Sequence, residues 1–116
     1  MSTSRVLITG GLGFIGSHHA ARLITAGRSV TVLDSLARPG ARLNRDFLAS
    51  HRSAGRLAIV PGDVRDAGLV RELVAASDIV VHLAAQVAVT TSVADPVADF
   101  EVNARGTLNL LEAMRA

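Results

Sequence analysis

The residues with the clearest chemical use are three glycines at three-residue spacing, Gly10, Gly13 and Gly16, between a short apolar run and a helical pattern. Gly10 would let the chain turn sharply, Gly13 would let the backbone approach a phosphate, and Gly16 would let the helix pack close to the sheet. A helix beginning near Phe14 would direct its free N–H groups and positive dipole end at a pyrophosphate. Glycines also form ordinary turns, but the position between strand and helix favours a dinucleotide site.

The charged and aromatic residues argue against a nucleic-acid partner. Twelve Arg and ten acidic residues give a formal net charge of +2, and the chain has no Lys, Tyr, Trp or Cys. The sequence pI of about 11.0 follows, because no Lys, Tyr or Cys titrates at alkaline pH. The arginines are scattered, and three Phe residues are the only aromatic side chains that could stack on bases.

Several absences point to a soluble cytoplasmic protein. The lack of Cys excludes disulfides and thiolate metal sites and fits a reducing compartment. The N-terminus has no long apolar segment of the kind found in signal peptides. The apolar stretch 79–89 is interrupted by His82 and Gln86 and is too short to span a bilayer, so we expect no membrane partner.

The four histidines do not form a metal site by their spacing. His18 and His19 are adjacent and cannot share a helix face, and His51 is expected to be exposed. His82 lies on an apolar run, where a core histidine is more common than a catalytic base. We therefore predict no bound metal.

Strand and helix patterns alternate along the chain, whose 116 residues suffice for one domain with a core. Short apolar runs predict strands at 5–9, 30–33, 57–60 and 79–83, and helices are expected at 14–26, 41–54, 67–76 and 96–114. Gly27 should end the first helix, and Asp66 and the pair Asp95–Pro96 should begin the third and fourth. Continuous apolar strands are typical of parallel sheets covered on both faces. We predict an α/β fold, a doubly wound Rossmann-type parallel sheet of four βα units in the order 3-2-1-4.

The helix expected at 96–114 is apolar on two opposite sides. One side carries Phe100, Ala104, Leu108 and Leu111, and the other Val102, Gly106, Leu110 and Ala113. A helix that packs on its own sheet needs one such side. The second would be covered by later chain or would form a homodimer seam, and Gly106 suggests that another backbone approaches there.

Five segments occur in order along the chain: TGGLGFIGSH, VLDSL, GDVRD, VVHLAAQ and VNARGTLNLLEA. Together they resemble the N-terminal half of the extended short-chain dehydrogenase/reductase family, the NAD-dependent nucleotide-sugar epimerases and dehydratases. Residues 36–48 and 86–116 are most similar to the CDP-tyvelose (CDP-paratose) 2-epimerases. Galactose epimerases of the family usually have a Lys where this chain has Val87, so the resemblance disfavours that activity.

The resemblance implies a set of residues for an NAD cofactor. The pyrophosphate would be lined by Gly10, Gly13, Phe14, Ile15 and Gly16, the adenosine ribose would bind Asp34, and adenine would contact Asp63 and Val64. The backbone of Leu83, Ala84, Ala85 and Gln86 would run beneath the cofactor. Thr90, Thr91 or Ser92 could reach the nicotinamide or the sugar, Asn103 would help to order the site, and Arg38 could meet a 2′-phosphate. In the alternative interpretation Asp34 would be only a turn residue, and Gly62–Asp63 would be only a turn that ends a strand.

Hydride chemistry in this family requires a Tyr-x-x-x-Lys pair, in which the tyrosine removes a hydroxyl proton while hydride leaves the carbon. Neither residue type occurs here, so we predict no catalytic residue in this chain. Two hypotheses stay open. The chain is the NAD-binding part (1–116) of a longer nucleotide-sugar epimerase, with a 4,6-dehydratase or decarboxylase as the alternative, or it is an NAD-binding module without chemistry. An apolar strand at the sheet edge and the second apolar helix face favour the first.

Overall fold

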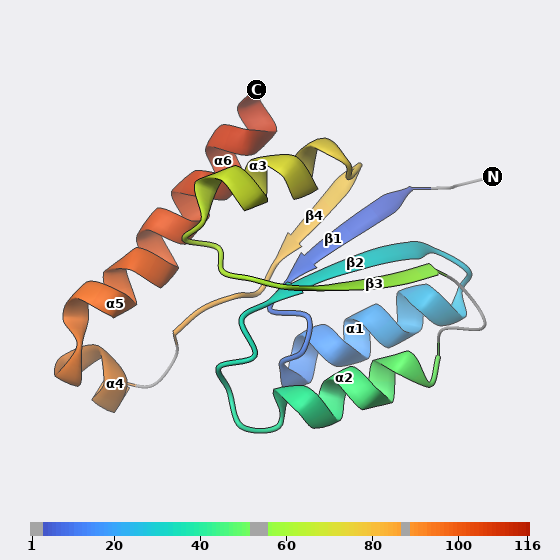
Figure 1. Cartoon of the computed structure of the whole chain (residues 1–116), viewed down its shortest axis with the longest axis horizontal. Coiled ribbons are helices and arrows are strands. Elements are labelled where there is room, and N and C mark those ends of the chain that lie inside the picture. The colour runs from blue at the N-terminus through green and yellow to red at the C-terminus, as the bar shows by residue number, and fades with distance from the viewer. Residues whose placement is uncertain (1–3, 52–55, 87–88) are drawn as a thin grey trace.

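One parallel sheet flanked by helices forms the fold in the computed structural model, which describes residues 4–51, 56–86 and 89–116 (Figure 1). The strands of this sheet are β1 (Arg5–Thr9), β2 (Ser29–Asp34), β3 (Arg56–Pro61) and β4 (Ile79–His82). The helices are α1 (Phe14–Thr25), α2 (Ala41–Ala49), α3 (Ala67–Ala75), α4 (Val89–Ala94), α5 (Pro96–Phe100) and α6 (Gly106–Arg115). A π-helical turn, η2 (Glu101–Arg105), joins α5 to α6.

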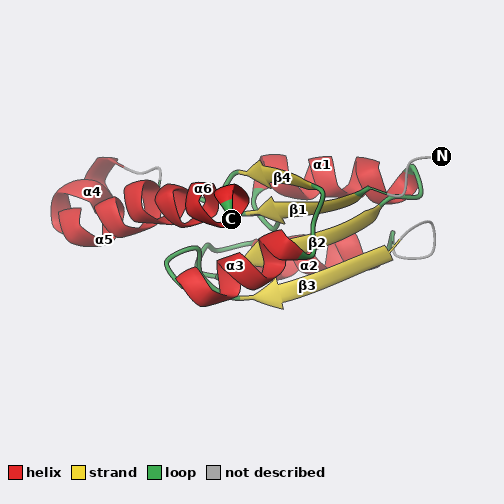
Figure 2. Cartoon of the chain, turned by 90° about the horizontal axis from the view of Figure 1, so that it is seen from above, coloured by secondary structure: helices red, strands yellow, loops and turns green. Residues whose placement is uncertain are grey.

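The strand order is β3-β2-β1-β4 and all neighbouring strands are parallel, which confirms the predicted doubly wound sheet. Helices α1 and α2 cover one face of the sheet, and α3 and α6 cover the other (Figure 2). After β3 the chain returns to the far side of β1 to form β4, so the strand order switches between β1 and β4. In such sheets ligands bind outside the carboxyl ends of the strands at the switch point.

Alternate residues of β1 are buried in the two opposite layers of the core. Val6 and Ile8 belong to the cluster covered by α1 and α2, whereas Leu7 belongs to the cluster covered by α3 and α6. All three are at most 3% exposed. Because both faces of the sheet are covered, the strand needs no polar side, and this explains its continuous apolar sequence.

The predicted helix over 41–54 is too long. Helix α2 ends at Ala49, where the Ser50 hydroxyl donates to the Phe47 carbonyl oxygen (2.6 Å). The His51 N–H donates to the Leu48 carbonyl oxygen (3.0 Å), three residues earlier, so the chain ends the helix with a turn of the 3₁₀ type. Residues 52–54 of the expected helix lie outside the described residues. The other predicted bounds agree to within one residue, but α4 was not predicted.

The predicted helix ends are confirmed. Gly27 follows α1 with a φ of 85°, in the left-handed region that favours glycine. The Asp66 carboxylate accepts a hydrogen bond from the Leu69 N–H at the start of α3 (3.1 Å). Asp95 accepts one from the Ala98 N–H, with proline at the first turn of α5.

The last predicted helix runs from Pro96 to Arg115, with the π-helical turn inside it. One apolar side packs on the core, where Gly106 and Leu110 are buried. The neighbour of Gly106 is a side chain and not the backbone that we expected, since a Cβ there would lie 2.5 Å from Val64 Cγ2.

The opposite side of this helix is exposed. Phe100, Leu108 and Leu111 are each more than half exposed, at 58%, 52% and 59%. In the part of the chain that the structure describes, no helix has both the length and the apolar character needed to cross a membrane.

Candidate cofactor-binding site

The glycine turn after β1 lies at the switch point of the sheet. Gly10 has a φ of 69°, and its N–H donates to the Leu33 carbonyl oxygen (2.8 Å), so the turn is tied to the end of β2. A Cβ at Gly10 would lie 2.7 Å from the Ala84 nitrogen and 2.9 Å from the Leu83 carbonyl carbon. The turn that follows β4 therefore packs directly on this glycine, and a larger residue does not fit.

Helix α1 begins immediately after the glycine turn. Its N-cap is Gly13, which has no side chain that could form a capping hydrogen bond with the first N–H groups of the helix. A Cβ at Gly16 would overlap the Gly10 carbonyl oxygen and lie 2.8 Å from Gly11 Cα. Gly16 thus lets α1 close on its own loop, whereas we expected it to let the helix approach the sheet.

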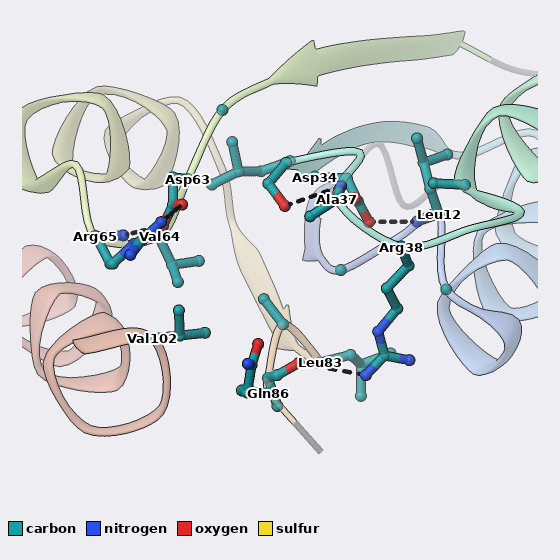
Figure 3. Close-up of a pocket in the computed structure, with 18 of the residues that line it drawn as sticks. Leu12, Asp34, Ala37, Arg38, Asp63, Val64, Arg65, Leu83, Gln86 and Val102 are labelled. Atoms are coloured by element: carbon teal, nitrogen blue, oxygen red, sulfur yellow. Dashed lines mark hydrogen bonds and ion pairs between the residues drawn. The ribbon is translucent and has the colours of Figure 1, made fainter. Parts of the chain in front are cut away.

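A pocket of about 290 Å³ lies at the carboxyl ends of the strands (Figure 3). Most residues expected at the cofactor line it, namely Gly10, Gly13, Asp34, Asp63, Val64, Leu83, Ala84, Ala85 and Gln86. Phe14, Ile15 and Gly16 are not among the lining residues, and the Phe14 and Ile15 side chains are exposed at the start of α1. Their contact with a pyrophosphate stays a prediction.

Asp34 connects the end of β2 to the glycine turn. One carboxylate oxygen accepts a hydrogen bond from the Leu12 N–H (3.0 Å), and the other accepts one from the Leu36 N–H (2.8 Å). Leu36 has a φ of 62°, a conformation that costs energy for a residue with a side chain. Asp34 therefore holds a turn and also lines the pocket, and its contact with a ribose stays a prediction.

Asp63 is held by Arg65 on the other side of the pocket. The guanidinium donates from Nε to one carboxylate oxygen (3.0 Å) and from Nη2 to the other (2.7 Å). This hydrogen-bonded Arg65 lowers the pKa of Asp63, and the Arg65 N–H adds a further bond to the carboxylate. No sequence signal singled out Arg65, which also lines the pocket.

Arg38 extends across the pocket from the segment after β2 towards the segment after β4 (Figure 3). Its Nη2 donates to the Ala85 carbonyl oxygen (3.3 Å). The Arg38 guanidinium therefore lies at the edge of the pocket, bonded to the protein backbone.

The segment 83–86 is fixed at both ends. Thr9 Oγ1 accepts hydrogen bonds from the N–H groups of Leu83 (3.1 Å) and Ala84 (3.2 Å). The Asn103 side chain accepts from the Gln86 N–H (2.7 Å) and donates to the Gln86 carbonyl oxygen (3.0 Å). The ordering role implied for Asn103 is consistent with these two bonds.

The residues expected near the nicotinamide or the sugar do not line this pocket. Thr90 and Thr91 are exposed on α4, and Ser92 donates its hydroxyl to the Val89 carbonyl oxygen (2.7 Å). Val87, which stands at the lysine position of galactose epimerases, lies outside the described residues.

Sequence reasoning gave His82 no function beyond the core, and the structure gives its ring two polar contacts. Nδ1 lies 2.6 Å from Thr9 Oγ1, and Nε2 lies 3.1 Å from Thr107 Oγ1. Burial lowers the pKa of His82. Its partners are 73 and 25 residues away in sequence, so no local pattern could have revealed them.

A doubly wound sheet whose glycine turn opens on a pocket at the switch point defines a dinucleotide-binding domain of the Rossmann type. The sequence family described as GDP-mannose 4,6 dehydratase matches residues 7–116. The chain belongs to the extended short-chain dehydrogenase/reductase family of NAD-dependent nucleotide-sugar epimerases and dehydratases.

Individual relatives include both reaction types. The chain is 45% identical to a CDP-paratose 2-epimerase of Salmonella typhi, over 96% of this chain and 32% of that protein. It is also 45% identical to a dTDP-glucose 4,6-dehydratase of Mycolicibacterium smegmatis, over 96% of this chain and 33% of that protein. The solved UDP-glucose 4-epimerase of Stenotrophomonas maltophila, with NAD and formylated UDP-arabinopyranose bound, superposes with a TM-score of 0.84 at 33% identity, covering 97% of this chain and 33% of that one. The chain thus spans about a third of the length of these relatives.

Proposed function

We propose that this chain is the NAD-binding part of a nucleotide-sugar epimerase. The glycine turn carries the proposal, because Gly10 and Gly13 line the pocket without Cβ atoms and α1 begins there without a side-chain cap. The UDP-glucose 4-epimerase with bound NAD shares this fold, which supports the same cofactor here.

The residues present fit NAD. The free N–H groups at the start of α1 would bind the pyrophosphate without a charged side chain. Each Asp34 oxygen accepts one backbone hydrogen bond and has capacity for another, so ribose hydroxyls could still donate to it. Because Arg65 binds both oxygens of Asp63, a contact with adenine would use the remaining acceptor capacity of that carboxylate. When bound, NAD supplies a reversible acceptor for hydride.

We further propose that the whole enzyme converts CDP-paratose to CDP-tyvelose reversibly, by transient oxidation of the sugar. The sugar carbon would lose hydride and regain it on the opposite face, so that no external oxidant is consumed. The subfamily-like segments at 36–48 and 86–116, with Val87 in place of lysine, support this reaction. A 4,6-dehydratase is the second candidate, because the chain has the same sequence identity, 45%, to the dehydratase of Mycolicibacterium smegmatis as to the epimerase of Salmonella typhi.

Two measurements on the full-length protein test these proposals. Calorimetric titration with NAD should show saturable binding, which Gly13→Ala should weaken. NMR of CDP-, UDP- and dTDP-sugars incubated with the protein in deuterated water should show inversion at C2. A stable 4-keto-6-deoxy product with deuterium at C6 would identify a dehydratase, and NAD binding without turnover of any sugar would favour a module without chemistry.

The exposed side of α5 and α6 leads to a proposal about assembly. Phe100, Leu108 and Leu111 are exposed at helical spacing on the side away from the core, and a second copy of the chain could cover them as a homodimer. Light scattering should show a dimer for the full-length protein and a monomer for Leu108→Glu. A monomeric unaltered protein would contradict the homodimer.

A further inference from the structure

The ring of His82 connects three elements through a chain of side-chain hydrogen bonds. Its Nδ1 meets Thr9 at the end of β1, and its Nε2 meets Thr107 on α6. The Thr107 hydroxyl lies 2.6 Å from the Asn103 carbonyl oxygen, one turn earlier in the helix. Thr9 is fully buried, so its hydroxyl depends on protein partners.

The available acceptors place one proton of this ring on Nε2. The Asn103 carbonyl oxygen can only accept, so Thr107 donates its single proton to it and must accept from His82. His82 therefore carries a proton on Nε2. In the neutral ring Nδ1 is then an acceptor, and Thr9 donates its hydroxyl proton to it.

With its proton directed at His82, Thr9 Oγ1 presents its lone pairs to the backbone of the next turn. These lone pairs receive the N–H groups of Leu83 and Ala84. The same two residues pack on Gly10, where an added Cβ would lie 2.7 Å from the Ala84 nitrogen. The Leu83 N–H is shared with the Thr9 carbonyl oxygen (3.0 Å), whereas for the Ala84 N–H the Thr9 hydroxyl is the recorded acceptor. The orientation of this hydroxyl thus helps to hold the turn after β4, at Ala84, against the glycine turn.

We propose that His82 is a positioning residue of the cofactor site: as the neutral ring with its proton on Nε2, it orients the Thr9 hydroxyl that fixes the turn at Leu83 and Ala84. This inference rests on the proposed binding of NAD. A second proton, on Nδ1, would point at the Thr9 oxygen, whose lone pairs already serve two amides, and would leave the Thr9 hydroxyl proton without its acceptor. Protonation of His82 should therefore loosen the segment 83–86 and weaken NAD binding.

The surrounding charges do not offset this effect. The groups that contact the ring nitrogens are the neutral hydroxyls of β1 and α6. The charged side chains on the adjoining elements form their own pairs: Arg5 of β1 with Asp78, Arg105 with Glu101 in η2, and Arg115 with Glu112 in α6. Asp99, at the end of α5, accepts from the Asn103 side chain (3.3 Å).

The first test is the protonation state itself, measured on the full-length protein by ¹⁵N NMR of the imidazole nitrogens. At neutral pH we expect a protonated Nε2 and an unprotonated Nδ1 on His82. Thr107→Val removes the acceptor for Nε2 and should give a mixture of tautomers, whereas Thr107→Ser should restore the single form. A proton on Nδ1 in the unaltered protein would overturn the proposal.

The second test is the pH dependence of NAD affinity, which a merely structural histidine would not alter. The dissociation constant should rise about tenfold as the pH is lowered through the pKa of His82, which burial holds below the ordinary histidine value of about 6.5. A tenfold change is expected when one buried hydrogen bond loses its partner. In His82→Asn the side-chain oxygen can accept from Thr9 at every pH, so this dependence should disappear. The matched control is His51→Asn, because the recorded contacts of the His51 ring are with Phe47 and Ser50 at the end of α2, on a different helix from the His82 network.

The outcomes separate this inference from the proposed function. If the unaltered protein binds NAD and the pH dependence is the same in His82→Asn, the proposed function stands and the positioning role is wrong. If the unaltered protein binds no NAD at any pH, the proposed function is wrong, and the cofactor-positioning role of His82 is wrong as well. Circular dichroism at each pH checks that the variants are folded.

Discussion

Three glycine-to-alanine variants can separate the physical contributions to the glycine turn. Gly10 has a φ of 69° and close backbone neighbours, whereas Gly40 has a φ of 89° and nothing within 4 Å of an added Cβ. Gly13 has an ordinary φ of −77°, and its added Cβ would meet only the Gly10 carbonyl oxygen, at 3.3 Å. Gly40→Ala therefore reports backbone strain alone, Gly10→Ala reports strain with a steric clash, and Gly13→Ala adds a methyl group at the pocket.

The expected magnitudes follow from these contacts. Left-handed backbone costs an alanine about 1–2 kcal/mol, so Gly40→Ala should lower the free energy of unfolding by about that amount. At Gly10 the clash with the Ala84 and Leu83 backbone adds about 1–3 kcal/mol, as overpacking of a fixed core does. Gly13→Ala should change stability by less than about 1 kcal/mol but weaken NAD binding clearly, because the methyl group faces the proposed pyrophosphate site.

Urea denaturation followed by circular dichroism gives the stability of each variant, and calorimetry gives its NAD affinity. Gly40→Ala should bind NAD as the unaltered protein does. If Gly10→Ala is no less stable than Gly40→Ala, the turn at Leu83 and Ala84 yields freely, and the reasoning that it is held rigidly on Gly10 is refuted. If Gly13→Ala binds NAD normally, the pyrophosphate does not lie at this turn.

Asp34→Asn should narrow the preference for NAD over NADP, because the carboxylate would repel a 2′-phosphate by up to about 4 kcal/mol at roughly 4 Å; equal affinities in the unaltered protein, measured by titration with both cofactors, would contradict this assignment. The pKa of Asp63 is lowered in the fold by its hydrogen bonds to Arg65, so its contribution to stability is present above the ordinary Asp pKa and is lost as the pH falls below about 4. Acid denaturation of Arg65→Gln should therefore lack part of this loss, and identical pH profiles would count against the ion pair. Asp66→Ala should destabilise the protein by about 1 kcal/mol in urea denaturation, since the Leu69 N–H loses its cap, while Asp66→Ser should retain most of that stability.

Short-range interactions were readable from the sequence. The residue types alone indicate that Gly10 must turn, because only glycine adopts its backbone conformation without strain. Asp66 and Asp95 were identified as caps because a capping side chain binds an amide three residues away, within the same segment. The strand order also followed, since alternating strands and helices with right-handed crossovers leave few ways to build a covered parallel sheet.

Interactions between distant segments required the structure. The sequence shows that Gly106 is unusual within a helix, but only the packing shows that Val64, and not a second backbone, fills the space beside it. Arg65 is a local exception: it lies two residues from Asp63, but only the folded loop shows that its guanidinium turns back onto that carboxylate.

His82 shows the difference most clearly. The sequence determined a glycine turn, an acidic residue after the second strand and a histidine on the fourth, because each depends on its neighbours along the chain. The tertiary structure decided that this histidine lies between Thr9 and Thr107, because β1, β4 and α6 meet only when the sheet and its covering helix assemble. Hydrogen bonds need their donors and acceptors within about 3 Å, and for residues far apart in sequence only the folded chain sets that distance.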